Sequence, residues 1–209
     1  MAEKMYDKKL NIKTTGIREW GTKIIHYNRY EATPYTALDK LFQAYKIDKN
    51  HKVVDFGCGR GRVAFYIHNR FHVPVTGVEA HDRTYEEALN NKFRYKQKAK
   101  HIKAPIKLEY GLAEHYEIEL TDNLFYLFNP FSVNIFKKVV HNILKSIKKE
   151  TRPIDMILYY PIPEYKLFLN NHTPFQMINK IPVPTTADSL EKFVIYRYTP
   201  EGRNYLNET

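Results

Sequence analysis

A glycine-rich turn after a short apolar run constrains the fold of this chain most. Residues 53–61 read Val-Val-Asp-Phe-Gly-Cys-Gly-Arg-Gly. The two β-branched residues predict a buried strand. The three alternate glycines let the backbone turn sharply and approach a ligand without a Cβ clash. A strand-to-helix turn of this kind can hold a dinucleotide, so the stretch predicts a ligand at the end of the strand.

Asp55 narrows the choice of ligand, because this carboxylate stands just before the first glycine. It would repel the pyrophosphate of a dinucleotide and attract a ligand with a positive ammonium group, such as S-adenosylmethionine. The stretch resembles the first motif of the class I S-adenosylmethionine-dependent methyltransferases, Asp/Glu-x-Gly-x-Gly-x-Gly. The resemblance implies a set of cofactor-binding residues in this turn: Asp55, Phe56, Gly57, Cys58, Gly59 and Gly61.

A second acidic residue follows the next predicted strand, residues 72–78. Glu79 lies about 24 positions after Asp55, close to the spacing of about 20 at which an acidic residue reaches a ribose hydroxyl in such folds. We therefore assign Glu79 and its neighbour Ala80 to the cofactor site. Apolar residues at helical spacing between the two carboxylates predict the crossover helix: Val63, Ala64, Ile67 and Phe71.

The same alternation of strands and helices continues along the chain. Further strands are expected at 106–110, 124–128 and 156–160, with helices from Thr33-Pro34 to residue 45, from Asp82 with Tyr85, Ala88, Leu89 and Phe93 inward, and over 135–147. Two apolar runs, 175–183 and 192–198, predict a C-terminal antiparallel hairpin at the sheet edge. The pattern indicates an α/β fold, a Rossmann-like doubly wound, mostly parallel sheet with helices on both faces. We place an N-terminal arm at 1–29 and a single class I methyltransferase domain at 30–209.

The tripeptide Asn129-Pro130-Phe131 directly follows the fourth predicted strand. It resembles the Asn/Asp-Pro-Pro-Tyr/Phe motif of methyltransferases that act on planar amino groups, with one proline missing. The resemblance implies that Asn129 and the carbonyl of Pro130 accept hydrogen bonds from the target nitrogen, while Phe131 stacks on the acceptor. Alignment of that nitrogen with the methyl group would then supply most of the rate. The alternative is a turn in which Ser132 caps the next helix.

Two further segments complete the expected cofactor site. Residues 111–114, Gly-Leu-Ala-Glu, match the family's third motif in part, with Leu112 in place of an acidic residue. We expect Leu112 to pack on the adenine, Ala113 to bind its edge through the backbone, and Glu114 to take the acidic role. Upstream, Tyr30, Thr33 and Tyr35 are candidates for the methionine end, with an ordinary helix start as the alternative. Asn129 is placed in the cofactor site as well.

The composition bounds the remaining possibilities. The 209 residues carry a net charge of +10, concentrated in residues 4–29, in 94–107, and in the helix with Lys137, Lys138, Lys145, Lys148 and Lys149. A basic chain suits RNA or another polyanion, although lysines also simply solvate a surface. We expect no membrane span and no signal peptide. The single cysteine permits no internal disulfide, which fits a reducing compartment, so we expect a cytoplasmic protein. His68 and His72 lie four apart without a third ligand, so we expect surface histidines and no metal.

These patterns favour an S-adenosylmethionine-dependent methyltransferase that acts on an amine, with an RNA base as the first candidate acceptor. A protein side chain or a small metabolite is the alternative acceptor. A non-catalytic nucleic-acid-binding protein with a retained cofactor fold is an alternative of another class. A dehydrogenase is disfavoured by Asp55.

Overall fold

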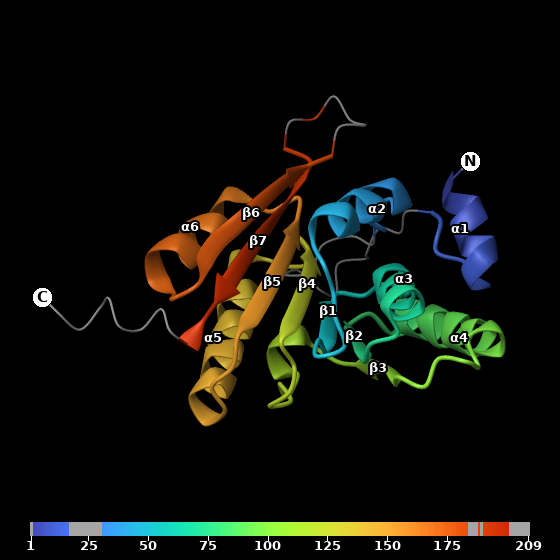
Figure 1. Cartoon of the computed structure of the whole chain (residues 1–209), viewed down its shortest axis with the longest axis horizontal. Coiled ribbons are helices and arrows are strands. Elements are labelled where there is room, and N and C mark those ends of the chain that lie inside the picture. Colours follow the sequence, from blue (N-terminus) through green and yellow to red (C-terminus); the bar gives the residue numbers. More distant parts are fainter. Residues whose placement is uncertain (1, 17–30, 184–187, 189, 201–209) are drawn as a thin grey trace, which may run out of the picture.

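A single seven-stranded sheet forms the centre of the computed structural model, which describes residues 2–16, 31–183, 188 and 190–200 (Figure 1). Its strands lie in the order β3-β2-β1-β4-β5-β7-β6. They are β1 (Val53–Phe56), β2 (Val75–Glu79), β3 (Ile106–Tyr110), β4 (Leu124–Phe128), β5 (Ile154–Tyr159), β6 (Gln176–Pro182) and β7 (Lys192–Tyr198). The first five strands are parallel, and β7 runs antiparallel to both of its neighbours.

Helices cover both faces of this sheet. They are α1 (Ala2–Leu10), α2 (Tyr35–Ala44), α3 (Arg62–Phe71), α4 (Asp82–Lys98), η1 (Ala113–His115), α5 (Val133–Lys149) and α6 (Pro163–His172). One hydrophobic cluster lies between the sheet and α1 to α4, and a second lies between the sheet and α5 and α6. The predicted doubly wound sheet with a C-terminal antiparallel hairpin is confirmed. None of the helices in the described part of the chain is long and apolar enough to span a membrane.

The strand order reverses between β1 and β4. Strand β1 pairs with β2 on one side and with β4 on the other, so that Asp55 lies between Gly77 and Tyr126. Ligands of open α/β sheets bind outside the carboxyl ends of the strands at such a switch point. The fold therefore locates the candidate site at the end of β1.

The N-terminal boundary differs from the prediction of a separate arm over residues 1–29. Helix α1 contacts α2 and α3, and Leu10 and Ile12 are buried in the same cluster as the residues under α2. Residues 2–16 are therefore part of the folded domain, because their apolar side chains complete its core. Residues 17–29 lie outside the described part of the chain.

Several predicted elements are displaced for local reasons. Strand β2 begins at Val75 rather than at residue 72, because His72 ends α3 in the left-handed region with a φ of 55°. Helix α4 is capped by His81, whose side chain accepts a hydrogen bond from the Thr84 backbone N–H, and not by Asp82. Helix α6 was not predicted, since its hydrophobic pattern is weakly amphipathic.

Helix α4 buries part of the predicted face, since Ala88 is buried and Tyr85 packs against the core. Leu89 is 39% exposed and Phe93 is 70% exposed, whereas Tyr95 is buried. The expected surface position of His68 is wrong for a related reason. Its Nδ1 lies 2.6 Å from the Tyr95 hydroxyl and its Nε2 lies 2.9 Å from the Ala104 carbonyl oxygen. The side chains of His68 on α3 and Tyr95 on α4 therefore form a polar contact between these two helices.

Candidate functional site

The sequence segments predicted to bind a ligand meet at the carboxyl edge of the sheet. The glycine turn follows β1, Glu79 ends β2, and the 129–131 segment follows β4. The first and last of these are in contact, because a Cβ added to Gly57 would lie 2.5 Å from the Cβ of Pro130. Gly57 also has a φ of 72°. Only glycine therefore satisfies both the turn and the approach of Pro130.

Asp55 is a buried carboxylate with an open oxygen. The residue is 3% exposed, and its Oδ2 has no hydrogen-bond partner among the residues that the structure describes. Burial raises the pKa of Asp55 to about 8, the nearby Glu79 carboxylate adds to the increase, and the backbone N–H of Ala64 opposes it. Burying a carboxylate in this way is costly unless a positive group lies beside it. The position is therefore suited to a cationic part of a ligand.

The raised pKa predicts how Asp55 affects stability. Between its ordinary value of 3.8 and about 8, the folded protein holds a proton that the unfolded chain has lost. The contribution of Asp55 to the free energy of unfolding therefore falls as the pH rises through this window, by up to about 1.4 kcal/mol per pH unit. Asp55→Asn removes this dependence, so the variant should gain stability over the wild type from about pH 5 to pH 8. Urea unfolding at a series of pH values measures the difference, and parallel curves would contradict the burial of an uncompensated carboxyl.

Glu79 connects the glycine turn to the loop after β2. Its Oε2 accepts a hydrogen bond of 2.8 Å from the Gly59 N–H, and its Oε1 accepts one of 2.8 Å from the His81 N–H. Burial raises the pKa of this carboxyl. Each carboxylate oxygen of Glu79 has a further lone pair that can accept a hydrogen bond from a ribose hydroxyl. The ribose-binding role of Glu79 stays a prediction. In this structure Glu79 holds the turn in shape.

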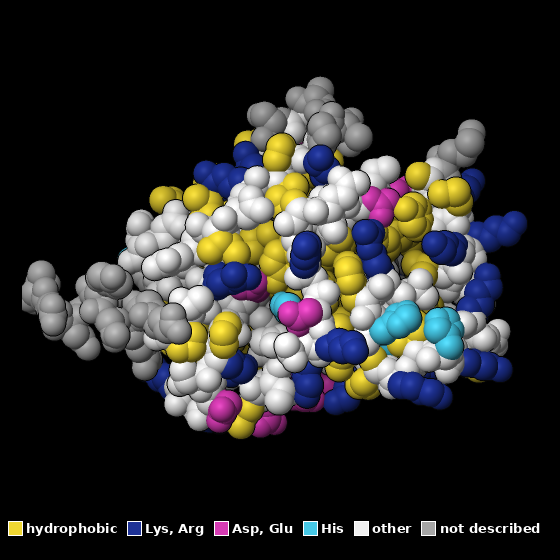
Figure 2. Space-filling model, viewed as in Figure 1, with side chains coloured by type: hydrophobic (Ala, Val, Ile, Leu, Met, Phe, Trp, Pro, Cys, Tyr) yellow, Lys and Arg dark blue, Asp and Glu magenta, His cyan; other side chains and the backbone are white. Residues whose placement is uncertain are grey.

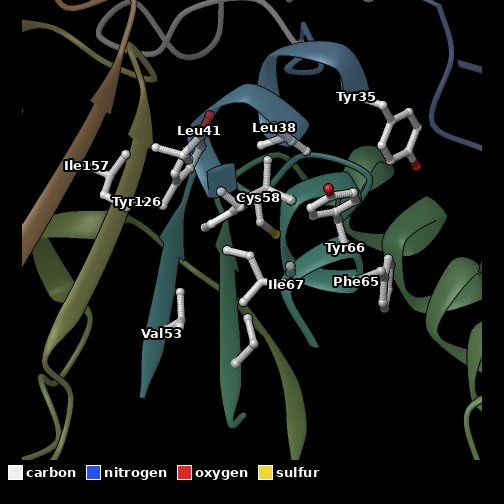
Figure 3. Close-up of a cluster of buried hydrophobic side chains, with 14 of the residues drawn as sticks. Tyr35, Leu38, Leu41, Val53, Cys58, Phe65, Tyr66, Ile67, Tyr126 and Ile157 are labelled. Atoms are coloured by element: carbon white, nitrogen blue, oxygen red, sulfur yellow. The ribbon is translucent and has the colours of Figure 1, made fainter. Parts of the chain in front are cut away.

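Two residues of the predicted cofactor set contribute their side chains to the core instead. Cys58 is 6% exposed and points into the cluster under α2 (Figure 3), where a Cβ on Gly77 would lie 2.8 Å from its Sγ. The expectation that Cys58 faces the cofactor is therefore wrong for its side chain, and burial raises the pKa of its thiol. Phe56 is fully buried and stacks on Phe125. At both positions only the backbone is available to a ligand.

The segment after β4 combines an unusual backbone with a buried ring. Asn129 has a φ of 40°, in the left-handed region that asparagine tolerates better than most residues. Phe131 is 0% exposed, and its carbonyl accepts a hydrogen bond from the Tyr165 hydroxyl. Its ring is buried in this structure, and the stacking role stays a prediction. Phe131 anchors the start of α5 in the second hydrophobic cluster.

The upstream candidates are also structural in this conformation. Thr33 is 1% exposed, and its Oγ1 lies 2.7 Å from the hydroxyl of Tyr126, the sheet neighbour of Asp55. The Tyr35 hydroxyl donates a hydrogen bond of 2.8 Å to Asp7. Tyr30 lies outside the described residues. These contacts favour the helix-start alternative for Thr33 and Tyr35.

Two arginines that the sequence analysis did not single out flank Gly61. Arg62 is 4% exposed, forms an ion pair with Glu3 and donates a 3.1 Å hydrogen bond to the Thr33 carbonyl. Arg60 forms an ion pair of 2.7 Å with Glu87. The glycine turn is thus tied to α1, to α4 and to the segment before α2. These partners are 27 or more positions away in sequence, so no local signal identifies them.

The loop after β3 completes the site. The Gly111 N–H donates a hydrogen bond of 3.0 Å to the Glu79 carbonyl, and the Asn142 side chain donates one of 2.8 Å to the Glu114 carbonyl. Ala80 and Leu112 are partly exposed, while Ala113 is buried. The predicted adenine-binding loop is therefore held between β2 and α5. Within the described ranges, no group of three or more His, Cys, Asp or Glu side chains is arranged to hold a metal ion.

Solved structures of other proteins share this fold at low sequence identity. No protein-family model and no curated protein sequence matches the chain. An RNA methyltransferase from Salinibacter ruber, crystallised with S-adenosyl-L-homocysteine, is similar in structure with a TM-score of 0.56 and 14% identity over 81% of this chain and 93% of that one. The fold is the one that methyltransferases share.

Two more solved structures share this fold with the chain. Human methyltransferase 10 domain containing protein has a TM-score of 0.57 and 10% identity, over 95% of this chain and 94% of that one. Fibrillarin from Aeropyrum pernix, with natively bound S-adenosyl-L-methionine, has a TM-score of 0.53 and 13% identity over 78% of this chain and 73% of that one. At these identities the likeness concerns the fold, and the chemistry must be argued from the site.

Proposed function

We propose that this protein is an S-adenosylmethionine-dependent methyltransferase. The observation that carries the proposal is Asp55, a buried carboxylate at the switch point of a methyltransferase-like sheet, with one oxygen that has no hydrogen-bond partner in the described part of the chain. An ammonium group beside Oδ2 would compensate the buried negative charge, whereas a pyrophosphate would add to it. Solved structures of this fold include one with bound S-adenosyl-L-methionine and one with S-adenosyl-L-homocysteine, which supports the same ligand here.

In this proposal, different residues at the carboxyl edge of the sheet bind different parts of the ligand. Asp55 would hold the ammonium group, the backbone of the glycine turn would lie along the ligand, and Glu79 would reach the ribose. The loop from Leu112 to Glu114 would hold the adenine. The ligand supplies an electrophilic methyl group on a sulfonium when bound.

We further propose that the acceptor is an amine, with an RNA base as the first candidate. Asn129 lies at the end of β4, beside the strand that carries Asp55. Its side-chain oxygen and the Pro130 carbonyl are acceptors for an N–H, and an aligned, more tetrahedral nitrogen is a better nucleophile. The RNA methyltransferase with this fold and the net charge of +10 support RNA over a protein side chain or a metabolite.

Ligand-dependent thermal unfolding tests the cofactor assignment. S-adenosylhomocysteine at 100 times its Kd should stabilise the protein by about 2.7 kcal/mol, and NAD at the same concentration should leave the melting temperature unchanged. Stabilisation by NAD instead would indicate a dehydrogenase. No response to either ligand would favour a non-catalytic protein. Transfer of radiolabelled methyl groups to fractionated RNA, DNA, protein and metabolites then identifies the acceptor class.

A further inference from the structure

A hollow of the molecule lies away from the glycine turn, along α5. It is a groove of about 670 Å³ between α5, η1 and the ends of α6 and β7. Leu144, Ile147 and Tyr198 give it an apolar lining, and Lys138, Lys145 and Lys148 supply positive charge. Glu114 alone among the lining residues is acidic. One end of the groove therefore begins at the loop proposed to hold the adenine.

The lysines follow the helix in a single stripe. Lys138, His141, Lys145 and Lys148 are separated by three or four positions and are all exposed. At a rise of about 1.5 Å per residue, the stripe runs about 15 Å along the groove. Side chains at this spacing are neighbours on one helix face. An extended anion, rather than a single small one, matches that length.

The positive charges of the stripe are not balanced within their own helix. Helix α5 contains no acidic residue, and Lys145 and Lys148 are three positions apart, a spacing at which like charges repel. In the described part of the chain, no acidic side chain forms an ion pair with Lys138 or Lys145. Lys148 lies in the last turn, where the helix dipole favours a cation, but Lys138 and Lys145 have no such reason. These two exposed lysines are therefore available to a negatively charged ligand.

The distribution of positive charge does not by itself identify this groove as a binding site, because Lys and Arg side chains are spread over the face shown in Figure 2. The groove differs because it combines cations with an apolar floor. Tyr198 is 2% exposed, and within the described ranges its hydroxyl has no hydrogen-bond partner. Proteins that bind single-stranded nucleic acid combine a positive groove for the backbone with apolar and aromatic surfaces for the bases.

We propose that this groove binds a single-stranded segment of the RNA substrate, with its phosphates on Lys138 and Lys145 and its bases toward the apolar floor. The inference rests on the proposed function, since it places the substrate of the same enzyme. It adds a second contact region to the one at Asn129, so that one segment of the RNA is held while another carries the target base.

Two pairs of substitutions within α5 test the location. Lys138→Gln with Lys145→Gln removes two lysines that line the groove, and Lys137→Gln with Lys149→Gln removes two that do not. Both pairs change the net charge equally on the same helix. Binding of fluorescein-labelled oligouridylate is measured by anisotropy from about 50 to 200 mM salt. Binding weakens with salt, so the slope of log K against log salt is negative. The groove pair should make this slope shallower by about 1.4, at about 0.7 per lost phosphate contact, and the control pair should change it much less.

The outcomes separate this inference from the proposed function. Equal slopes for the two pairs, no RNA binding by the wild type at low salt, or preferential binding of polyglutamate would each overturn the groove assignment. S-adenosylhomocysteine binding is measured by calorimetry on the same preparations. Normal cofactor binding by both pairs shows that they are folded. Absence of cofactor binding by the wild type would instead count against the methyltransferase.

Discussion

Asp55→Asn should weaken binding of S-adenosylmethionine while making the free protein more stable at pH 8. The substitution keeps the size of the side chain but removes its negative charge. Loss of a hydrogen bond to a charged group costs about 1.5–3 kcal/mol, so the Kd measured by calorimetry should rise at least about tenfold. The free protein no longer has to bury a carboxylate whose pKa is raised to about 8. Affinity and stability should therefore change in opposite directions.

This opposition separates a ligand-binding role from a structural one. If Asp55 served mainly to support α3 by accepting the Ala64 N–H, Asp55→Asn would keep both that hydrogen bond and the affinity, because the amide oxygen is also an acceptor, whereas Asp55→Ala would lose stability and affinity together. Unchanged affinity in a stably folded variant would remove the ammonium-binding role altogether. Asp122 is a suitable control carboxylate, since burial raises its pKa to about 6 but it lies at the opposite end of the strands. Asp122→Asn should leave the Kd unchanged.

Asn129→Ala should lower kcat by about 10²–10³ with little change in cofactor affinity. The expected loss is that of one preorganised polar partner in a transition state. The measurement is single-turnover methyl transfer to whichever acceptor the radiolabel assay identifies. Full turnover by the variant would reduce residues 129–131 to a helix-starting turn.

The backbone at this position requires a second variant. Asn129 has a φ of 40°, so alanine adds strain that asparagine tolerates better. Asn129→Gly removes the side chain without that strain, and it should lose as much activity as the alanine variant if the amide itself acts on the acceptor. Recovery of activity in the glycine variant would show that backbone geometry, not the amide, is what matters.

Phe131→Ala should differ from both Asn129 variants, with a loss of about 3–5 kcal/mol of stability, because its ring is in the core.

Much of the fold followed from short-range pattern. A strand of two β-branched residues, a glycine turn and an amphipathic helix form a local unit, and its repetition predicts a parallel sheet with helices on both faces. The period of two along β1 also separates Asp55 from Phe56, since successive side chains of a strand point to opposite faces. The conformational demand on Gly57 is partly local too, because its left-handed φ of 72° favours glycine.

The contacts of the site were decided by tertiary structure. The sequence placed Phe131 beside Asn129, but its ring is buried in the second hydrophobic cluster, and its carbonyl accepts a hydrogen bond from the Tyr165 hydroxyl of α6. Cys58 turns toward β2 because Gly77 leaves room for its sulfur. Arg62 is buried by partners in α1 and before α2. None of these pairings has a local sequence signal, since each joins segments distant along the chain.

The same division explains the lysines of α5. The amino-acid sequence by itself determined a basic amphipathic helix after β4, because side-chain direction along a helix follows from its period. Which of its lysines line a groove depended on where η1 packs against that helix and on where β7 ends beside the groove. Local periodicity sets the direction of a side chain relative to its own helix, whereas its surroundings come from contacts between distant segments.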